Sequence, residues 1–118
     1  MTLDPGALVD MLEIVGDDAA FVGDIVDTYL ADSPTQLAGM RDALAANDLV
    51  TLGRLAHTLK GNSRNVGATL LAEIARELEE RARVGDTTDA ATRIAAADAE
   101  FARVSVALNA AGARGWRT

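Results

Sequence analysis

Hydrophobic residues recur every three or four positions over most of the chain, a spacing typical of one face of an α-helix. Four long segments carry this pattern, separated by short stretches rich in Gly, Asn and Asp. No segment shows the alternation of hydrophobic and polar residues that a half-buried strand requires. We predict four long helices whose buried positions are Phe21, Ile25, Tyr29, Leu37, Met40 and Leu44; Leu49, Leu52, Leu55, Ala56 and Leu59; Leu70, Leu71, Ile74, Leu78 and Ala82; and Ile94, Ala97, Phe101, Val104, Leu108 and Ala111.

Capping residues indicate where these helices begin and end. The pair Asn47-Asp48 supplies the N-cap of the second long helix, which we expect to reach about Arg64. Residues 65–67 form the next turn, and Gly85 ends the third long helix. These signals predict short connections throughout.

Two prolines affect the predicted helices differently. The hydrophobic stripe of the first long helix passes through Ser33-Pro34 without a break, so we expect one helix with a kink rather than two helices. Asp4-Pro5 resembles an N-cap followed by proline at the first helical position, which predicts an additional short helix to about Val15.

Four long amphipathic helices with short connections are typical of an antiparallel up-down-up-down bundle. We therefore predict an all-α four-helix bundle, with the short extra N-terminal helix covering one end. The 118 residues, 49% of them hydrophobic, suit a single core. We expect residues 1–112 to form one domain and residues 113–118 to form a flexible tail.

Composition narrows the possible functions. The net charge of -7 argues against a nucleic-acid partner, because phosphate backbones attract excess Lys and Arg. The absence of cysteine excludes disulfides and thiolate metal sites. No stretch approaches the roughly 20 apolar residues of a membrane span, so we expect no membrane association and a cytoplasmic location.

The chain has one histidine, His57, which the helical pattern places on the solvent side of the second long helix. Its helical neighbours are Gly53, Lys60, Gly61 and Arg64, and Arg54 lies within one turn. A glycine inside a helix costs about 1 kcal/mol relative to alanine, so two of them beside one histidine suggest that something must approach the imidazole.

Acidic residues are absent from positions 49–72, although 18 in 118 would give about four in 24 positions. An imidazole surrounded by cations suits a group that accepts and releases a phosphoryl group. The sequence has neither a phosphate-binding glycine loop nor a carboxylate cluster placed to hold Mg²⁺. We therefore expect no autonomous kinase activity, and a second protein must supply the metal.

A longer motif surrounds His57. It consists of Ala56-His57-Thr58-Leu59-Lys60-Gly61-Asn62-Ser63, then Val66-Gly67-Ala68, Leu71 and Leu78-Glu79. This motif resembles the signature of histidine-containing phosphotransfer (HPt) domains of bacterial multistep phosphorelays, and the resemblance extends over nearly the whole chain. One departure is Asn62, where many members carry a small residue.

The resemblance implies a role for each residue of the site. His57 would be the phosphorylated residue, Lys60 the cation beside the phosphoryl group, and Gly61 the gap through which a receiver domain approaches. Glu79 falls where members of the family place a polar residue that hydrogen-bonds the ring nitrogen that is not phosphorylated. Alternatively, Glu79 could be an ordinary exposed acid that pairs with Arg76 or Arg83 on its own helix.

The implied partners are receiver domains of response regulators and a hybrid histidine kinase, and Mg²⁺ is expected on the receiver rather than on this chain. We expect a monomer that binds its partners transiently. Candidate docking residues are Val50 and Val66 as an apolar patch and Gly53, Arg54 and Arg64 around it, although Gly53 could simply permit close helix packing and Arg64 could be a solvated charge.

Three other functions compete with this one. A non-catalytic helical adaptor could bind a protein through the His57 face without being phosphorylated. A dimerisation domain of a histidine kinase usually has an acidic residue directly after its histidine, whereas Thr58 follows here. A metal-binding bundle needs further histidines or a Glu-x-x-His pair, which the chain lacks.

Overall fold

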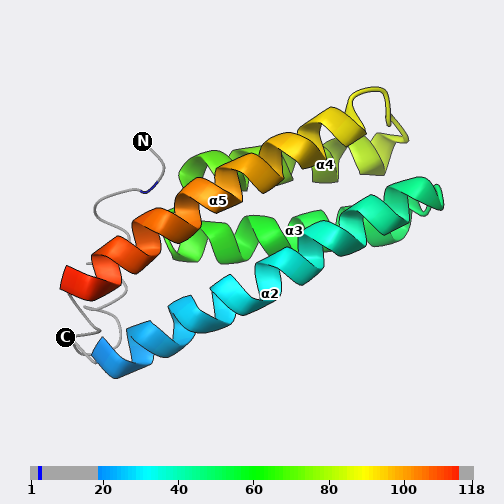
Figure 1. The fold of residues 1–118 in the computed structure, drawn as a ribbon. Coiled ribbons are helices and arrows are strands. Elements are labelled where there is room, and N and C mark those ends of the chain that lie inside the picture. Colours follow the sequence, from blue (N-terminus) through cyan, green and yellow to red (C-terminus); the bar gives the residue numbers. More distant parts are fainter. Residues whose placement is uncertain (1–2, 4–18, 115–118) are drawn as a thin grey trace.

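The computed structural model describes Leu3 and residues 19–114, which contain four α-helices and no strand. The helices are α2 (Ala19–Ala45), α3 (Leu49–Asn65), α4 (Thr69–Val84) and α5 (Ala90–Arg114) (Figure 1). The predicted all-α four-helix bundle is confirmed. The short helix predicted from Asp4 to about Val15 lies outside the described residues.

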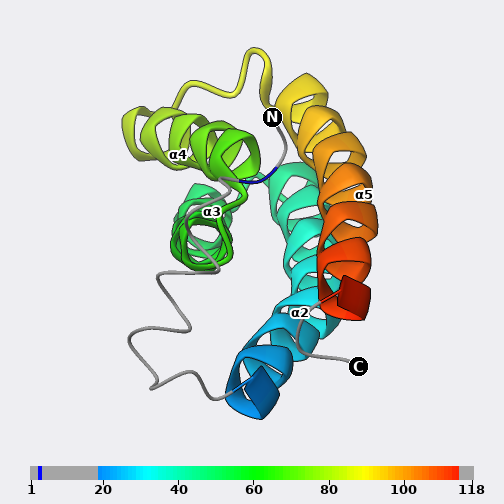
Figure 2. The same cartoon turned by 90° about the vertical axis from the view of Figure 1, so that its left-hand side faces the viewer.

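The helices form an antiparallel bundle in which consecutive helices pack side by side and α5 returns to pack against α2. Figure 2 shows α3 and α4 next to each other and α2 and α5 on the other side of the bundle. The latter two have 27 and 25 residues, against 17 and 16 for α3 and α4. The long helices therefore extend together past one end of the α3–α4 pair (Figure 1).

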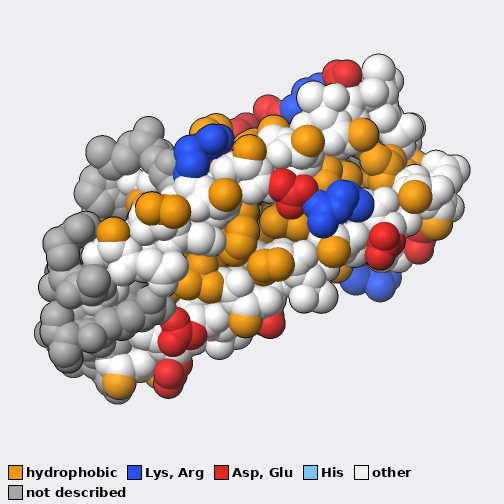
Figure 3. All heavy atoms as spheres, viewed as in Figure 1, with side chains coloured by type: hydrophobic (Ala, Val, Ile, Leu, Met, Phe, Trp, Pro, Cys, Tyr) orange, Lys and Arg blue, Asp and Glu red, His pale blue; other side chains and the backbone are white. Residues whose placement is uncertain are grey.

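The core is mostly aliphatic. Its largest fully buried hydrophobic side chains are Leu37, Met40, Leu52, Leu59, Leu71, Leu78, Ile94, Leu108, Val22, Val26 and Val66. Hydrophobic side chains also line the seam between α2 and α5 (Figure 3). Most of the predicted stripe positions of α3 and α5 are buried or packed against this core.

Two predicted core residues are exposed. Phe21 is 48% exposed, because α2 turns the neighbouring strip of Val22 and Val26 towards the core. Leu70 is 49% exposed, because α4 buries small alanines beside Leu71 instead. In both helices, two adjacent rows of apolar residues have helical spacing. Packing against the other helices determines which of the two rows is buried.

The predicted caps hold the helix ends. Asp48 Oδ1 accepts a hydrogen bond from the Thr51 backbone N–H at 3.1 Å, which confirms the N-cap of α3. Gly85 ends α4 in the left-handed conformation with φ of 77°, which glycine adopts without steric cost. Helix α3 ends at Asn65, one residue beyond its predicted end.

Helix α2 runs through Pro34 without interruption, which confirms one helix rather than two. The kink at this position stays a prediction. Beside the proline, Ser33 Oγ donates a 2.7 Å hydrogen bond to the Tyr29 carbonyl oxygen. At the other end of the chain, α5 continues to Arg114, two residues into the predicted tail, and residues 115–118 lie outside the described part.

Candidate functional site

His57 lies in the middle of α3 and points away from the core. Its neighbours Ala56 and Leu59 are fully buried, and they fix the rotation of the helix about its axis. Of the His57 side chain, 66% is exposed. The predicted solvent-facing position is therefore confirmed.

One carboxylate on α4 contacts two side chains of α3. Glu79 Oε2 lies 2.6 Å from His57 Nδ1, and Glu79 Oε1 accepts a 2.5 Å hydrogen bond from Lys60 Nζ. A carboxylate can only accept, so the His57 contact requires a proton on Nδ1. The arrangement leaves Nε2 as the outward nitrogen, and no described residue forms a hydrogen bond with it.

The alternative pairing of Glu79 within its own helix does not occur. Arg76 instead pairs with Glu73, with Nη2 2.6 Å from Oε1, and Arg83 pairs with Glu80. Both of these pairs join residues three positions apart on α4. Glu79 is consequently available to α3.

The surroundings of Glu79 favour its charged form. Burial between the helices raises the pKa of the carboxyl, but the hydrogen bonds from Lys60 and His57 outweigh burial and lower its pKa below the usual range. Glu79 is therefore a carboxylate at neutral pH. Its charge stabilises a positive charge on the imidazole.

Lys60 is mostly buried, and its ammonium points towards Glu79. This places a cation within the same hydrogen-bonded cluster as the imidazole, in keeping with the predicted proximity of the two groups. Because Glu79 carries both contacts, Lys60 also orients the carboxylate that orients His57.

A groove between α3 and α4 opens beside the imidazole. It is lined by Leu49, Val50, Gly53, Arg54, His57, Glu79, Ala82 and Arg83. Val50 is 72% exposed, so this predicted docking residue is accessible. Val66 is fully buried, and its prediction as a docking residue was wrong, because it covers the core where the chain turns from α3 to α4.

The two glycines beside His57 have different surroundings. A Cβ on Gly53 would lie 3.5 Å from Ala82 Cβ, an ordinary contact, so Gly53 sits where α3 meets α4. A Cβ on Gly61 would meet nothing within 4 Å. Packing within the described part of the chain therefore does not require glycine at position 61.

The remaining predicted residues separate into two groups. Arg54 lies on the groove with His57, whereas Arg64 is exposed and outside it, close enough to Glu73 to help lower the pKa of that carboxyl. The sequence analysis did not assign Leu49, Ala82 or Arg83 to the site. Arg83 could have been found, because it follows Glu79 by four residues and so shares its helix face.

Among the described residues, no group of three or more His, Asp or Glu side chains could hold a metal ion. The same part of the chain contains no helix that is long and apolar enough to span a membrane.

The fold and the site define a helical-bundle protein that presents a single histidine to a partner. The model of the Hpt domain family matches residues 24–107. Phosphorelay protein LuxU of Vibrio vulnificus is 29% identical over 82 residues, 70% of each chain. Histidine-containing phosphotransfer protein B (HptB) of Pseudomonas aeruginosa PAO1 has a crystal structure that superposes with a TM-score of 0.87 at 35% identity, covering 96% of both chains.

The chain belongs to the Hpt domain family. It is accordingly an intermediate of a phosphorelay, a pathway that joins receiver domains and histidine kinases. These similarities favour the relay over the non-catalytic adaptor.

Proposed function

We propose that His57 accepts a phosphoryl group from the aspartyl phosphate of one receiver domain and transfers it to the aspartate of another. The observation that carries the proposal is the asymmetric imidazole: Nδ1 is held 2.6 Å from Glu79, while Nε2 points outward on a largely exposed side chain. A ring with one nitrogen engaged and the other accessible is set up as a nucleophile.

The transfer step follows from this arrangement. The Nε2 lone pair attacks phosphorus, a P–N bond forms, and the P–O bond to the aspartyl carboxylate breaks. The aspartate leaves as a carboxylate and takes the bonding electron pair. The ring becomes a cation with the proton still on Nδ1, and the Glu79 carboxylate stabilises that cation.

The second transfer is the reverse reaction with a different aspartate. Its carboxylate oxygen attacks phosphorus, and the P–N electron pair returns to Nε2. Throughout both steps Lys60 keeps Glu79 in place and adds positive charge near the phosphoryl group. Gly61 leaves room beside the imidazole for the receiver surface.

We propose that the receiver domain brings Mg²⁺ and the carboxylates that hold it, and that a hybrid histidine kinase feeds the relay. We further propose that the chain acts as a monomer in the cytoplasm, with Arg54, Arg64, Gly53 and Val50 contributing to docking. The open groove beside His57 supports such docking.

Incubation with a radiolabelled phosphorylated receiver tests the proposal. The wild-type chain should acquire an acid-labile, alkali-stable label, and His57→Gln should acquire none. Arg76→Gln is a suitable control, because Arg76 is exposed and pairs only within α4. Label on His57→Gln, or equal binding of both forms with no label from any receiver, would contradict the proposal, and the latter result would support the adaptor.

A further inference from the structure

The α3–α4 groove combines apolar and basic residues next to His57. Its floor is apolar, with Leu49 and Ala82 from facing helices and the exposed Val50 at its edge. Its charged residues besides the site itself are Arg54 on α3 and Arg83 on α4. We infer that this groove selects among receiver domains by binding an acidic side chain that lies next to an apolar one on the receiver surface.

This inference rests on the proposed function, because the receiver must bring its aspartyl phosphate to His57. The groove is continuous with that point. His57 and Leu49 are eight residues apart on α3, which corresponds to about 12 Å along the helix axis. A receiver docked at His57 therefore covers the groove, and contacts there are separate from the reacting atoms.

Both arginines can accept a new carboxylate partner. Arg54 is exposed and forms no salt bridge within the described part of the chain, and it lies close enough to Asp48 to help lower the pKa of that carboxyl. Arg83 pairs with Glu80 three positions earlier, and both side chains are exposed. An exposed pair of this kind contributes about 0–1 kcal/mol, so exchanging Glu80 for a carboxylate on a partner costs little.

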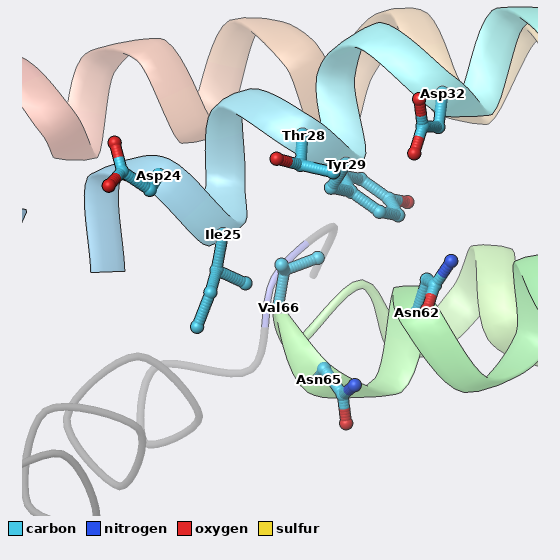
Figure 4. A pocket seen from close by; sticks show the side chains of 8 residues that line it. All are labelled: Asp24, Ile25, Thr28, Tyr29, Asp32, Asn62, Asn65 and Val66. Carbon is cyan, nitrogen blue, oxygen red and sulfur yellow. The ribbon is translucent and has the colours of Figure 1, made fainter. Parts of the chain in front are cut away.

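On the other side of α3 from the groove, α2 contributes acidic residues, so the two sides present opposite charge to a receiver. A hollow between α2 and the end of α3 is lined by Asp24 and Asp32 of α2 and by Asn62 and Asn65 of α3, and Asp32 points towards Asn62 (Figure 4). An acidic receiver patch would be repelled there and attracted to the α3–α4 groove. Repulsion between like charges therefore disfavours the wrong orientation of the receiver.

Steady-state phosphotransfer from a receiver that labels the wild-type chain tests the inference. We expect Arg83→Glu and Arg54→Glu each to raise KM for that receiver by about tenfold with little change in kcat, because they alter docking and not chemistry. Arg76→Glu is the matched control for Arg83→Glu, since Arg76 forms the same type of pair on the same helix but lies outside the groove. It should change KM less than about twofold.

A second variant makes the test independent of folding defects. Glu80→Gln removes the carboxylate that competes with the receiver for Arg83, so KM for the receiver should fall. In addition, KM should depend less on salt concentration in Arg83→Glu than in wild type. An unchanged KM in both groove variants, with transfer still abolished in His57→Gln, would overturn the groove inference and leave the proposed function intact. Absence of label on the wild-type chain would instead overturn the proposed function.

Discussion

Glu79 on α4 holds the imidazole of His57 on α3 by a 2.6 Å contact to Nδ1. Replacing Glu79 by alanine removes this contact and leaves Lys60 without its carboxylate. By analogy with the hydrogen-bond partners of metal-bound histidines, we expect phosphotransfer to slow by about 10- to 100-fold. Glu79→Gln should lose less, because its amide oxygen can still accept from the Nδ1 proton.

Nitrogen NMR measures the tautomer of His57, whose change we expect to cause the slower transfer. The chain has a single histidine, so its two ring signals are unambiguous. In the wild type the proton should reside on Nδ1, and in Glu79→Ala the Nε2-protonated form should gain population. A variant that keeps both the tautomer and the transfer rate would show that Glu79 does not position the ring.

The lowered pKa of Glu79 makes stability depend on pH in the acid range. Because the folded pKa lies below its ordinary value of 4.5, the carboxylate contributes stability that is complete above that value. The contribution is lost as pH falls through the folded pKa. Denaturant unfolding should show wild type more stable than Glu79→Gln at pH 6, with the difference disappearing towards pH 2.

Tyr29 should titrate abnormally late. Burial is the main reason that its pKa rises to about 12, and it outweighs the hydrogen bonds with Ser63 and Ser33. Since Tyr29 is the only tyrosine, absorbance at 295 nm should report this single group. A pKa raised in the fold contributes stability below pH 10 that is lost as pH rises to about 12. A midpoint near 10 in the folded protein would contradict the burial of the phenol.

The same phenol joins two helices. Tyr29 Oη and Ser63 Oγ are 2.9 Å apart in the core, which links α2 to the helix that carries His57. Tyr29→Phe should lower the free energy of unfolding by about 1–2 kcal/mol, because Ser63 loses its buried partner. Chemical denaturation measures this change. Transfer by the folded variant should remain close to wild type, since neither group reaches the imidazole.

Substitutions at Gly61 should change stability and phosphotransfer independently of each other. An added Cβ there meets no atom of the described residues within 4 Å, so Gly61→Ala should stabilise the helix by up to about 1 kcal/mol. A large side chain, as in Gly61→Gln, should fold equally well but impair transfer, because it obstructs the receiver. Thermal unfolding and transfer rates on the same samples check both parts, and unimpaired transfer by Gly61→Gln would contradict the predicted gap.

Capping residues and hydrophobic spacing predicted the helices and the exposed position of His57. Asp48 and Gly85 are caps whose chemistry acts within a few residues, and His57 faces away from a stripe of large aliphatic residues. The contact between His57 and Glu79 was also predicted, but from family resemblance, since residues on separate helices share no periodicity. Glu79 could not be placed against α3 from its own helix alone.

Packing between helices determined what the sequence pattern could not. Alanine-rich segments do not mark one face clearly, so Phe21 and Leu70 were assigned to the wrong side. Glu100 is buried although its charge predicts exposure, and Arg103 Nε donates to its Oε1 at 2.7 Å. The groove that Arg83 lines together with Arg54 forms only where α4 packs against α3.

The single outward nitrogen of His57 has a consequence for the order of events. In the proposed relay both receivers reach Nε2 over the same surface, so the donor departs before the acceptor arrives. The relay then follows ping-pong kinetics, and excess unphosphorylated acceptor competes with the donor for the free chain. The direction of net flow then depends on the relative abundance and phosphorylation of the two partners and on the relative free energies of hydrolysis of their aspartyl phosphates.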